Sequence, residues 1–97
     1  MVSYRGVSQE ELLEKAEILK VLGHPERLAI VLLTIDRELS VKELVEALKI
    51  SQPKVSQHVG IMKELGLLSH RKEGTKTLYK VKESLVKELV ELLFRSN

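Results

Sequence analysis

Cysteine is absent from the 97-residue sequence, and aromatic residues make up only 3% of it. Without cysteine the chain has no disulfides, no thiolate metal ligands and no thiol redox switch, which suits a reducing cytoplasm. The aromatic residues are Tyr4, Tyr79 and Phe94. So few aromatic side chains argue against a surface that binds single-stranded nucleic acid by stacking on its bases.

Long hydrophobic segments are also missing. The longest unbroken apolar run covers residues 28–33, far below the roughly 20 residues that span a bilayer. The first residues lack the apolar core of a secretory signal. Hydrophobic residues make up 43% of the chain and charged residues 31%, as in a globular protein. We therefore expect one cytoplasmic domain over residues 1–97, with a flexible arm at residues 1–7.

Charge is unevenly distributed along the chain, although its net value is only +2. Residues 1–48 contain six Lys/Arg and nine Asp/Glu, and residues 83–97 contain two and three. Residues 49–82 contain eight Lys/Arg and two Asp/Glu. A basic excess confined to one segment indicates a surface that faces phosphates, although solvated charge runs are common.

Capping residues and apolar periodicity predict a mainly α-helical fold with one β-hairpin. The sequence Ser-x-x-Glu, a capping box, opens helices at Ser8 and at Ser40. Gly23 and Pro25 separate two further helices. We expect helices over residues 8–22, 25–35, 40–48, 51–65 and 82–95, and strands over residues 67–72 and 76–81.

The helix over residues 51–65 has the pattern of a DNA recognition helix. Ser51 is its expected N-cap, and Gly66 its C-terminal stop. One face is apolar, with Val55, Val59, Met62 and Leu65. The other face is expected to hold polar side chains without carboxylates, namely Gln52, Lys54, Ser56, Gln57 and His58. An amphipathic surface helix would show a similar pattern, but the very short link to the helix over residues 40–48 favours a helix-turn-helix.

The hairpin and the two terminal helices supply two further candidate surfaces. Arg71, Lys72 and Lys76 cluster near the hairpin tip, where they could reach a DNA backbone beside the groove. Each terminal helix has more apolar positions than one packing face needs. The candidate dimer residues on these helices are Leu12, Leu13, Leu19, Leu85, Leu89 and Leu93.

In this order the elements resemble the ArsR/SmtB family of winged-helix transcriptional repressors. The resemblance rests on ILKVLGHPERLAIVLL at residues 18–33, SQPKVSQHVGIMKELGLL at residues 51–68, and RKEG followed by LYKV. It implies a homodimer that binds an imperfect inverted repeat in double-stranded DNA and blocks transcription. Gly60 departs from the family pattern, which usually has a longer polar residue at this position.

The residues that sense metals in many members of this family are not present. Ser40 and Lys42 stand at the positions of the family's C-x-C cysteines, and residues 82–97 contain neither His nor Asp. His24, His58 and His70 fall on separate predicted elements. We therefore expect no metal site and no cofactor, and the sequence identifies no effector.

Two other function classes compete with a DNA-binding repressor. An enzyme is not expected, because the sequence has no nucleophile–base set, paired carboxylates or glycine-rich phosphate loop. A winged-helix module that docks a protein within a transcription assembly is the stronger alternative, since fold does not fix function. The basic segment and the carboxylate-free helix face favour DNA.

Overall fold

The helices of the computed structural model begin and end close to the capping signals in the sequence. The structure describes residues 4–82 and 84–95. Within these ranges the elements are α1 (Gln9–Leu22), α2 (Pro25–Thr34), β1 (Leu39–Ser40), α3 (Val41–Leu48), α4 (Gln52–Glu64), β2 (Leu68–Glu73), β3 (Lys76–Val81) and α5 (Ser84–Leu93). The prediction of helices and a hairpin is confirmed, with α5 shorter at both ends than expected.

Side-chain caps fix the beginnings of the helices. The Ser8 and Ser51 hydroxyls accept from the backbone N–H groups three residues on. Ser40 forms the full reciprocal capping box, because its hydroxyl accepts from Glu43 N–H and its own N–H donates to the Glu43 carboxylate at 2.9 Å. Ser51 and Ser40 therefore set where the two helices of the helix-turn-helix start.

The C-terminal end of α4 is a Schellman motif that needs Gly66. This residue has a φ of +81°, its N–H donates to the Lys63 carbonyl, and Leu67 N–H donates to the Met62 carbonyl at 2.9 Å. The positive φ is accessible to glycine without steric penalty. The motif ends the helix and turns the chain directly into β2.

The three strands form one antiparallel sheet in the order β1-β3-β2. Glu73 pairs with Lys76, so the hairpin loop has two residues, and Gly74 at its first position has the positive φ (64°) that a type II′ turn requires there. The sequence did not predict β1, in which Leu39 and Ser40 pair with Tyr79 and Leu78. A strand of two residues is too short for alternation to show.

The core lies between α2, α3, α4, α5 and the inner part of the sheet. Its fully buried side chains include Ile30 and Val31 from α2, Leu44 from α3, and Val86 from α5. The predicted apolar face of α4 is confirmed, and its most deeply buried members are Val55, Val59 and Met62. Burial of this face leaves the opposite side of α4 on the surface.

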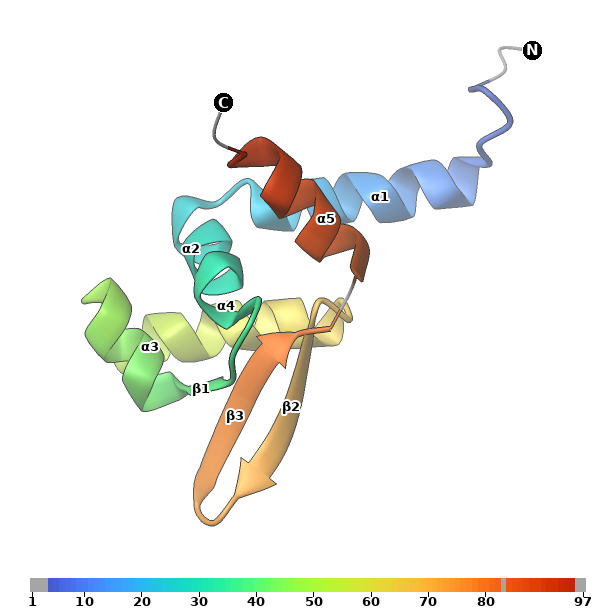
Figure 1. Ribbon diagram of the computed structural model, residues 1–97. Coiled ribbons are helices and arrows are strands. Elements are labelled where there is room, and N and C mark those ends of the chain that lie inside the picture. Colours follow the sequence, from blue (N-terminus) through green and yellow to red (C-terminus); the bar gives the residue numbers. More distant parts are fainter. Residues whose placement is uncertain (1–3, 83, 96–97) are drawn as a thin grey trace.

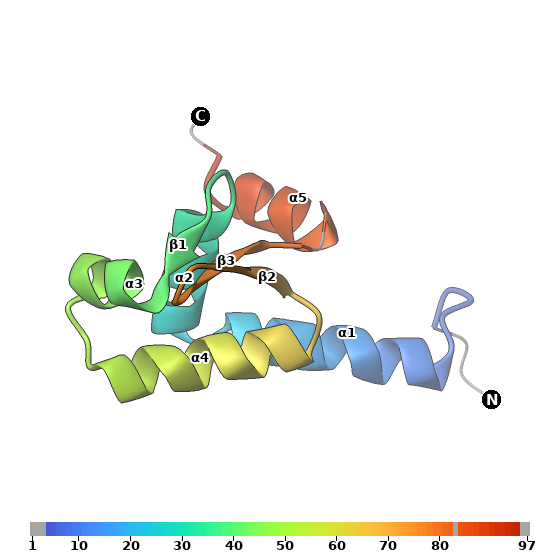
Figure 2. The same ribbon diagram turned by 90° about the horizontal axis from the view of Figure 1, so that it is seen from below.

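Helix α1 extends beyond the rest of the molecule in both views (Figures 1 and 2). Of its residues only Val21 and Leu22 are buried. Before it, Tyr4 and Val7 form an antiparallel bridge around Arg5 and Gly6, both with positive φ. Residues 4–7 thus form a tight turn within the segment that the sequence suggested as a flexible arm. Residues 1–3 of that arm lie outside the described part. Across the described residues, no helix is both long and apolar enough to cross a membrane.

Candidate nucleic-acid interface

Three residues, Lys49, Ile50 and Ser51, join α3 to α4 and set the geometry of the helix-turn-helix. Lys49 adopts the left-handed conformation with a φ of 56°, and its N–H donates to the Val45 carbonyl at 2.8 Å. Ile50 then leads to the Ser51 cap. Left-handed backbone at a single residue reverses the chain sharply, so α4 starts immediately beside the end of α3. This arrangement presents the first turns of α4 at the surface.

The outer face of α4 is polar and exposed, as predicted for four of its five candidate residues. The side chains of Gln52, Lys54, Ser56 and Gln57 are all exposed. The first turn contains no carboxylate. Amide and hydroxyl groups can donate to and accept from base edges, whereas Lys54 adds a positive charge.

The prediction that His58 belongs to this outer face is wrong. His58 is only 5% exposed, because it lies on the inner face of α4 between Val55 and Val59. The spacing already contained this signal, since position 58 is one turn beyond position 55. What the sequence did not show is how a buried imidazole would be satisfied, and its partners come from α2.

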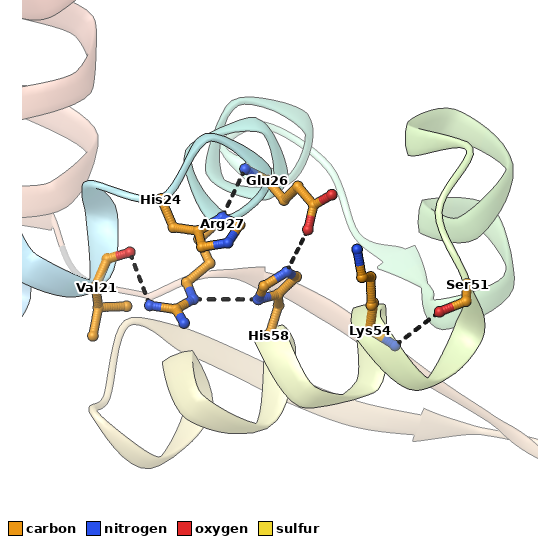
Figure 3. A network of polar contacts seen from close by, with 7 residues as sticks. All are labelled: Val21, His24, Glu26, Arg27, Ser51, Lys54 and His58. Atoms are coloured by element: carbon orange, nitrogen blue, oxygen red, sulfur yellow. Dashed lines mark hydrogen bonds and ion pairs between the residues drawn. The ribbon is translucent and has the colours of Figure 1, made fainter.

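Two consecutive residues of α2 bind the two ring nitrogens of His58 (Figure 3). Arg27 Nε donates to His58 Nδ1 at 3.2 Å, and His58 Nε2 lies 2.9 Å from Glu26 Oε1. A guanidinium has donors only. Nδ1 must therefore be the acceptor, and the ring proton lies on Nε2, from which it is donated to Glu26. Among the described residues no buried side-chain nitrogen or oxygen lacks a partner.

The hydrogen bond from His58 holds the pKa of the Glu26 carboxyl below its ordinary value. The partial burial of Glu26 opposes this shift, and the positive charge of Lys54 adds to it. Lys54 lies beside this carboxylate, one helical turn before His58 on α4 (Figure 3). Glu26 therefore stays ionised at neutral pH and lies between two side chains of the recognition helix, His58 and Lys54.

His24, Glu26 and His58 bring metal-ligand atoms within 4.8 Å of one another, although the two histidines lie on separate elements, as predicted. The ring centroids of His24 and His58 are also 4.8 Å apart. His24 caps α2, as predicted, by accepting from Glu26 N–H through Nδ1 at 3.1 Å. Both Nδ1 atoms are thus acceptors and both Nε2 atoms carry protons. This arrangement offers a cation N–H groups instead of lone pairs, and Arg27 adds a positive charge.

The hairpin of β2 and β3 extends away from the helices as a wing (Figure 1). The predicted backbone-contacting residues Lys72 and Lys76 are exposed near its tip. Arg71 is also exposed but is held by Glu38 at 2.7 and 2.8 Å and by Glu73 at 3.0 Å. The guanidinium holds the pKa of the Glu38 carboxyl below its ordinary value. In this structure Arg71 therefore ties the wing to the segment before β1, with its charge already compensated.

The terminal helices expose most of the apolar residues that the sequence suggested for a dimer. Leu13, Leu19 and Leu93 are each about 60% exposed, and Leu12 and Leu85 about 40%. Leu89 differs, because it is half-buried and packs against the core of its own chain. Leu92 and Phe94, which are 58% and 54% exposed, extend the apolar surface of α5.

Comparison with known proteins identifies the family. The sequence profile of the bacterial regulatory protein family arsR matches residues 24–70. The biofilm growth-associated repressor of Xylella fastidiosa is 36% identical over 81 residues, which cover 84% of this chain and 71% of the relative. The chain belongs to the ArsR family.

Solved structures show that the similarity includes the fold. Reduced HlyU from Vibrio cholerae, a protein named as a transcriptional activator, superposes with a TM-score of 0.84 at 34% identity, over 90% of this chain and 92% of HlyU. The homodimeric winged helix-turn-helix DNA-binding domain Mb0332 from Mycobacterium bovis superposes with a TM-score of 0.80 at 26% identity, over 96% of this chain and 86% of that one. This ArsR-family chain is therefore a winged helix-turn-helix protein.

Proposed function

We propose that this ArsR-family protein is a homodimeric, sequence-specific regulator that binds double-stranded DNA and represses transcription from an inverted-repeat operator. The observation that supports this most directly is the outer face of α4, where exposed amide, hydroxyl and ammonium groups occur without a carboxylate in the first turn. Base edges in a major groove present donors and acceptors to such groups.

The interface divides into residues that read bases and residues that bind the backbone. Gln52, Ser56 and Gln57 are assigned to base edges because their side chains are neutral and can both donate and accept. Lys54, Lys72 and Lys76 are assigned to phosphates, where a cation adds salt-dependent affinity with little sequence information. Arg71 is assigned the role of holding the wing in place, since two carboxylates bind its guanidinium.

The second protomer is assigned to the apolar surface of α1 and α5. Leucines that are half or more exposed along α1 and at the end of α5 would be covered by a symmetric copy of the same helices. The relative Mb0332 is described as homodimeric. Two-fold symmetry would place two copies of α4 about one helical turn of DNA apart, which matches the half-sites of an inverted repeat.

Neither a metal nor a thiol is assigned as the signal. Ser40 and Lys42 occupy the family's cysteine positions, the sequence has no cysteine at all, and α5 has neither His nor Asp. Catalysis is not assigned either, and the proposed site of action is cytoplasmic DNA. Repression is preferred to activation because an operator-bound dimer blocks polymerase access without any further contact.

The experiment that tests the proposal is a footprint of the native protein on the DNA upstream of its own gene, repeated across a salt series. A protected inverted repeat that persists near physiological salt is expected, together with reduced transcription from that promoter in a purified system. Protection that is diffuse and disappears with salt would contradict sequence-specific binding. No binding at any salt would favour the protein-docking module.

A further inference from the structure

Arg27 connects three helices through one guanidinium. It lies in α2, its Nη1 donates to the Val21 carbonyl in the last turn of α1 at 3.4 Å, and its Nε donates to His58 in the middle of α4 at 3.2 Å. The neighbouring Glu26 accepts from the other nitrogen of the same imidazole at 2.9 Å. Both edges of the His58 ring are thus held from α2 (Figure 3).

Directional contacts of this kind fix the rotation of a helix about its own axis. The other inner side chains of α4 are apolar: Val55, Val59 and Met62 are buried, and Ile61 and Leu65 are partly buried. Apolar packing is much less directional than a hydrogen bond. Successive helical residues are about 100° apart around the axis. The ring of His58 therefore determines the direction in which its neighbour Gln57 leaves the helix on the outer face.

We propose that Glu26, Arg27 and His58 are positioning residues for DNA sequence readout, which set the rotation of α4 relative to α1 and α2 and hence the direction of Gln52, Ser56 and Gln57. This inference rests on the proposed DNA-binding function. Because α1 also belongs to the proposed dimer surface, the Val21–Arg27–His58 connection relates α4 to the two-fold axis of the dimer as well.

A positioning role has a different signature from a purely structural one. If the three residues only stabilised the fold, their loss would weaken binding to every duplex equally. If they position α4, their loss makes the base contacts poorer, while Lys54, Lys72 and Lys76 still reach phosphates. Affinity for the operator then falls towards the affinity for unrelated DNA, and the salt dependence of binding to unrelated DNA stays the same.

The test uses Arg27→Lys, which keeps the charge but replaces two separated donors with a single ammonium. Binding is measured for a duplex selected by the native protein and for a scrambled duplex of the same composition, at several salt concentrations and below the onset of unfolding. We expect about a tenfold loss in the ratio of the two affinities. Arg95→Lys, an exposed exchange at the end of the described chain, is the matched control and should keep the native ratio.

A pair of Glu26 variants provides the second readout, which also serves if Arg27→Lys does not fold. Glu26→Gln keeps an acceptor for His58 Nε2 and should retain most of the ratio, whereas Glu26→Ala should lose it. Nitrogen NMR of the His58 ring should show the proton on Nε2 in the native protein and in Glu26→Gln. This spectrum needs no DNA, so it reports on the network itself.

The outcomes separate this inference from the function on which it rests. A native protein without preference for any duplex would overturn both. Native preference that survives unchanged in Arg27→Lys and Glu26→Ala would overturn the inference alone. Equal weakening on both duplexes, with a lowered melting temperature, would assign the three residues to fold stability and would also overturn it.

Discussion

The outer and inner faces of α4 both contain polar side chains, but only the inner ones have their hydrogen bonds completed by the chain itself. Gln57 is exposed on the outer face, whereas its neighbour His58 is 5% exposed and bound through both ring nitrogens. A buried polar group must be satisfied within the fold, while an exposed one remains available to a ligand. The same distinction applies to apolar groups, since Leu89 packs in the core and Leu93 does not.

Replacing each of the two neighbours with alanine should give the largest contrast in stability. His58→Ala removes a buried ring and leaves the donor of Arg27 and the carboxylate of Glu26 without their partner. We expect the free energy of unfolding to fall by about 2 kcal/mol. Gln57→Ala, the control one residue away, should change it by less than about 0.5 kcal/mol. Urea unfolding followed by circular dichroism measures both, and similar values would show that the inner contacts of His58 do not stabilise the fold.

A charge at an exposed leucine of α5 tests the surface proposed for the dimer. Leu93→Glu places a charge on the surface proposed for the partner protomer, so we expect the dimer to dissociate at least about tenfold more readily with an unchanged fold. Sedimentation measures the dissociation constant. Leu32→Glu, at an exposed leucine of α2 (45%), is the control and should leave a dimer. A native-like dimer of Leu93→Glu would place the interface elsewhere.

Gly60 lies one helical turn beyond Ser56 and Gln57 of α4, and it has room for a side chain. Apart from its own helix backbone, nothing lies within 4 Å of the position that a Cβ would take. Glycine inside a helix costs about 1 kcal/mol relative to alanine, so Gly60→Ala should raise the free energy of unfolding by about that amount. Equal affinities of both proteins for the operator would show that no phosphate approaches the backbone there, and a lower affinity of the variant would show the opposite.

Acid should lower the stability of the fold by protonating Glu26, and we expect this to be the smallest of the predicted effects. Its pKa is lowered in the folded protein, chiefly by the hydrogen bond from His58, so the stability that it contributes is complete above the ordinary glutamate pKa of about 4.3 and is lost as the pH falls towards the folded value. The free energies of unfolding of the native protein and of Glu26→Gln should therefore converge as the pH falls from about 6 to about 3. A constant difference would mean that the carboxylate charge does not contribute.

Local signals in the sequence predicted most of this fold. Ser8, Ser40 and Ser51 mark helix starts because each cap is made within four residues of its partner, and Gly66 marks a stop for the same reason. The spacing of Val55, Val59 and Met62 identified the buried face of α4. Such features depend on the chain nearby and can be read without a structure.

Contacts between distant segments could not be predicted in this way. His58 meets Glu26 and Arg27 across about thirty positions, and Arg71 meets Glu38 across a similar separation. Sequence alone therefore predicts that a polar residue on an apolar stripe, His58, lies at the surface and that a cation on the wing, Arg71, is available to DNA. In both cases the partner that compensates the residue comes from an element whose position only the tertiary structure shows.

Sequence readout by the outer face of α4 is tested most directly by comparing Gln57→Ala with Lys76→Ala on the operator, on duplexes with single base changes, and across a salt series. Gln57→Ala should reduce discrimination between these duplexes and leave the salt dependence as it is. Lys76→Ala should weaken all of them alike and lower the slope of log affinity against log salt by about 1. If both variants lose discrimination equally, or if neither does, the outer face of α4 does not read DNA sequence.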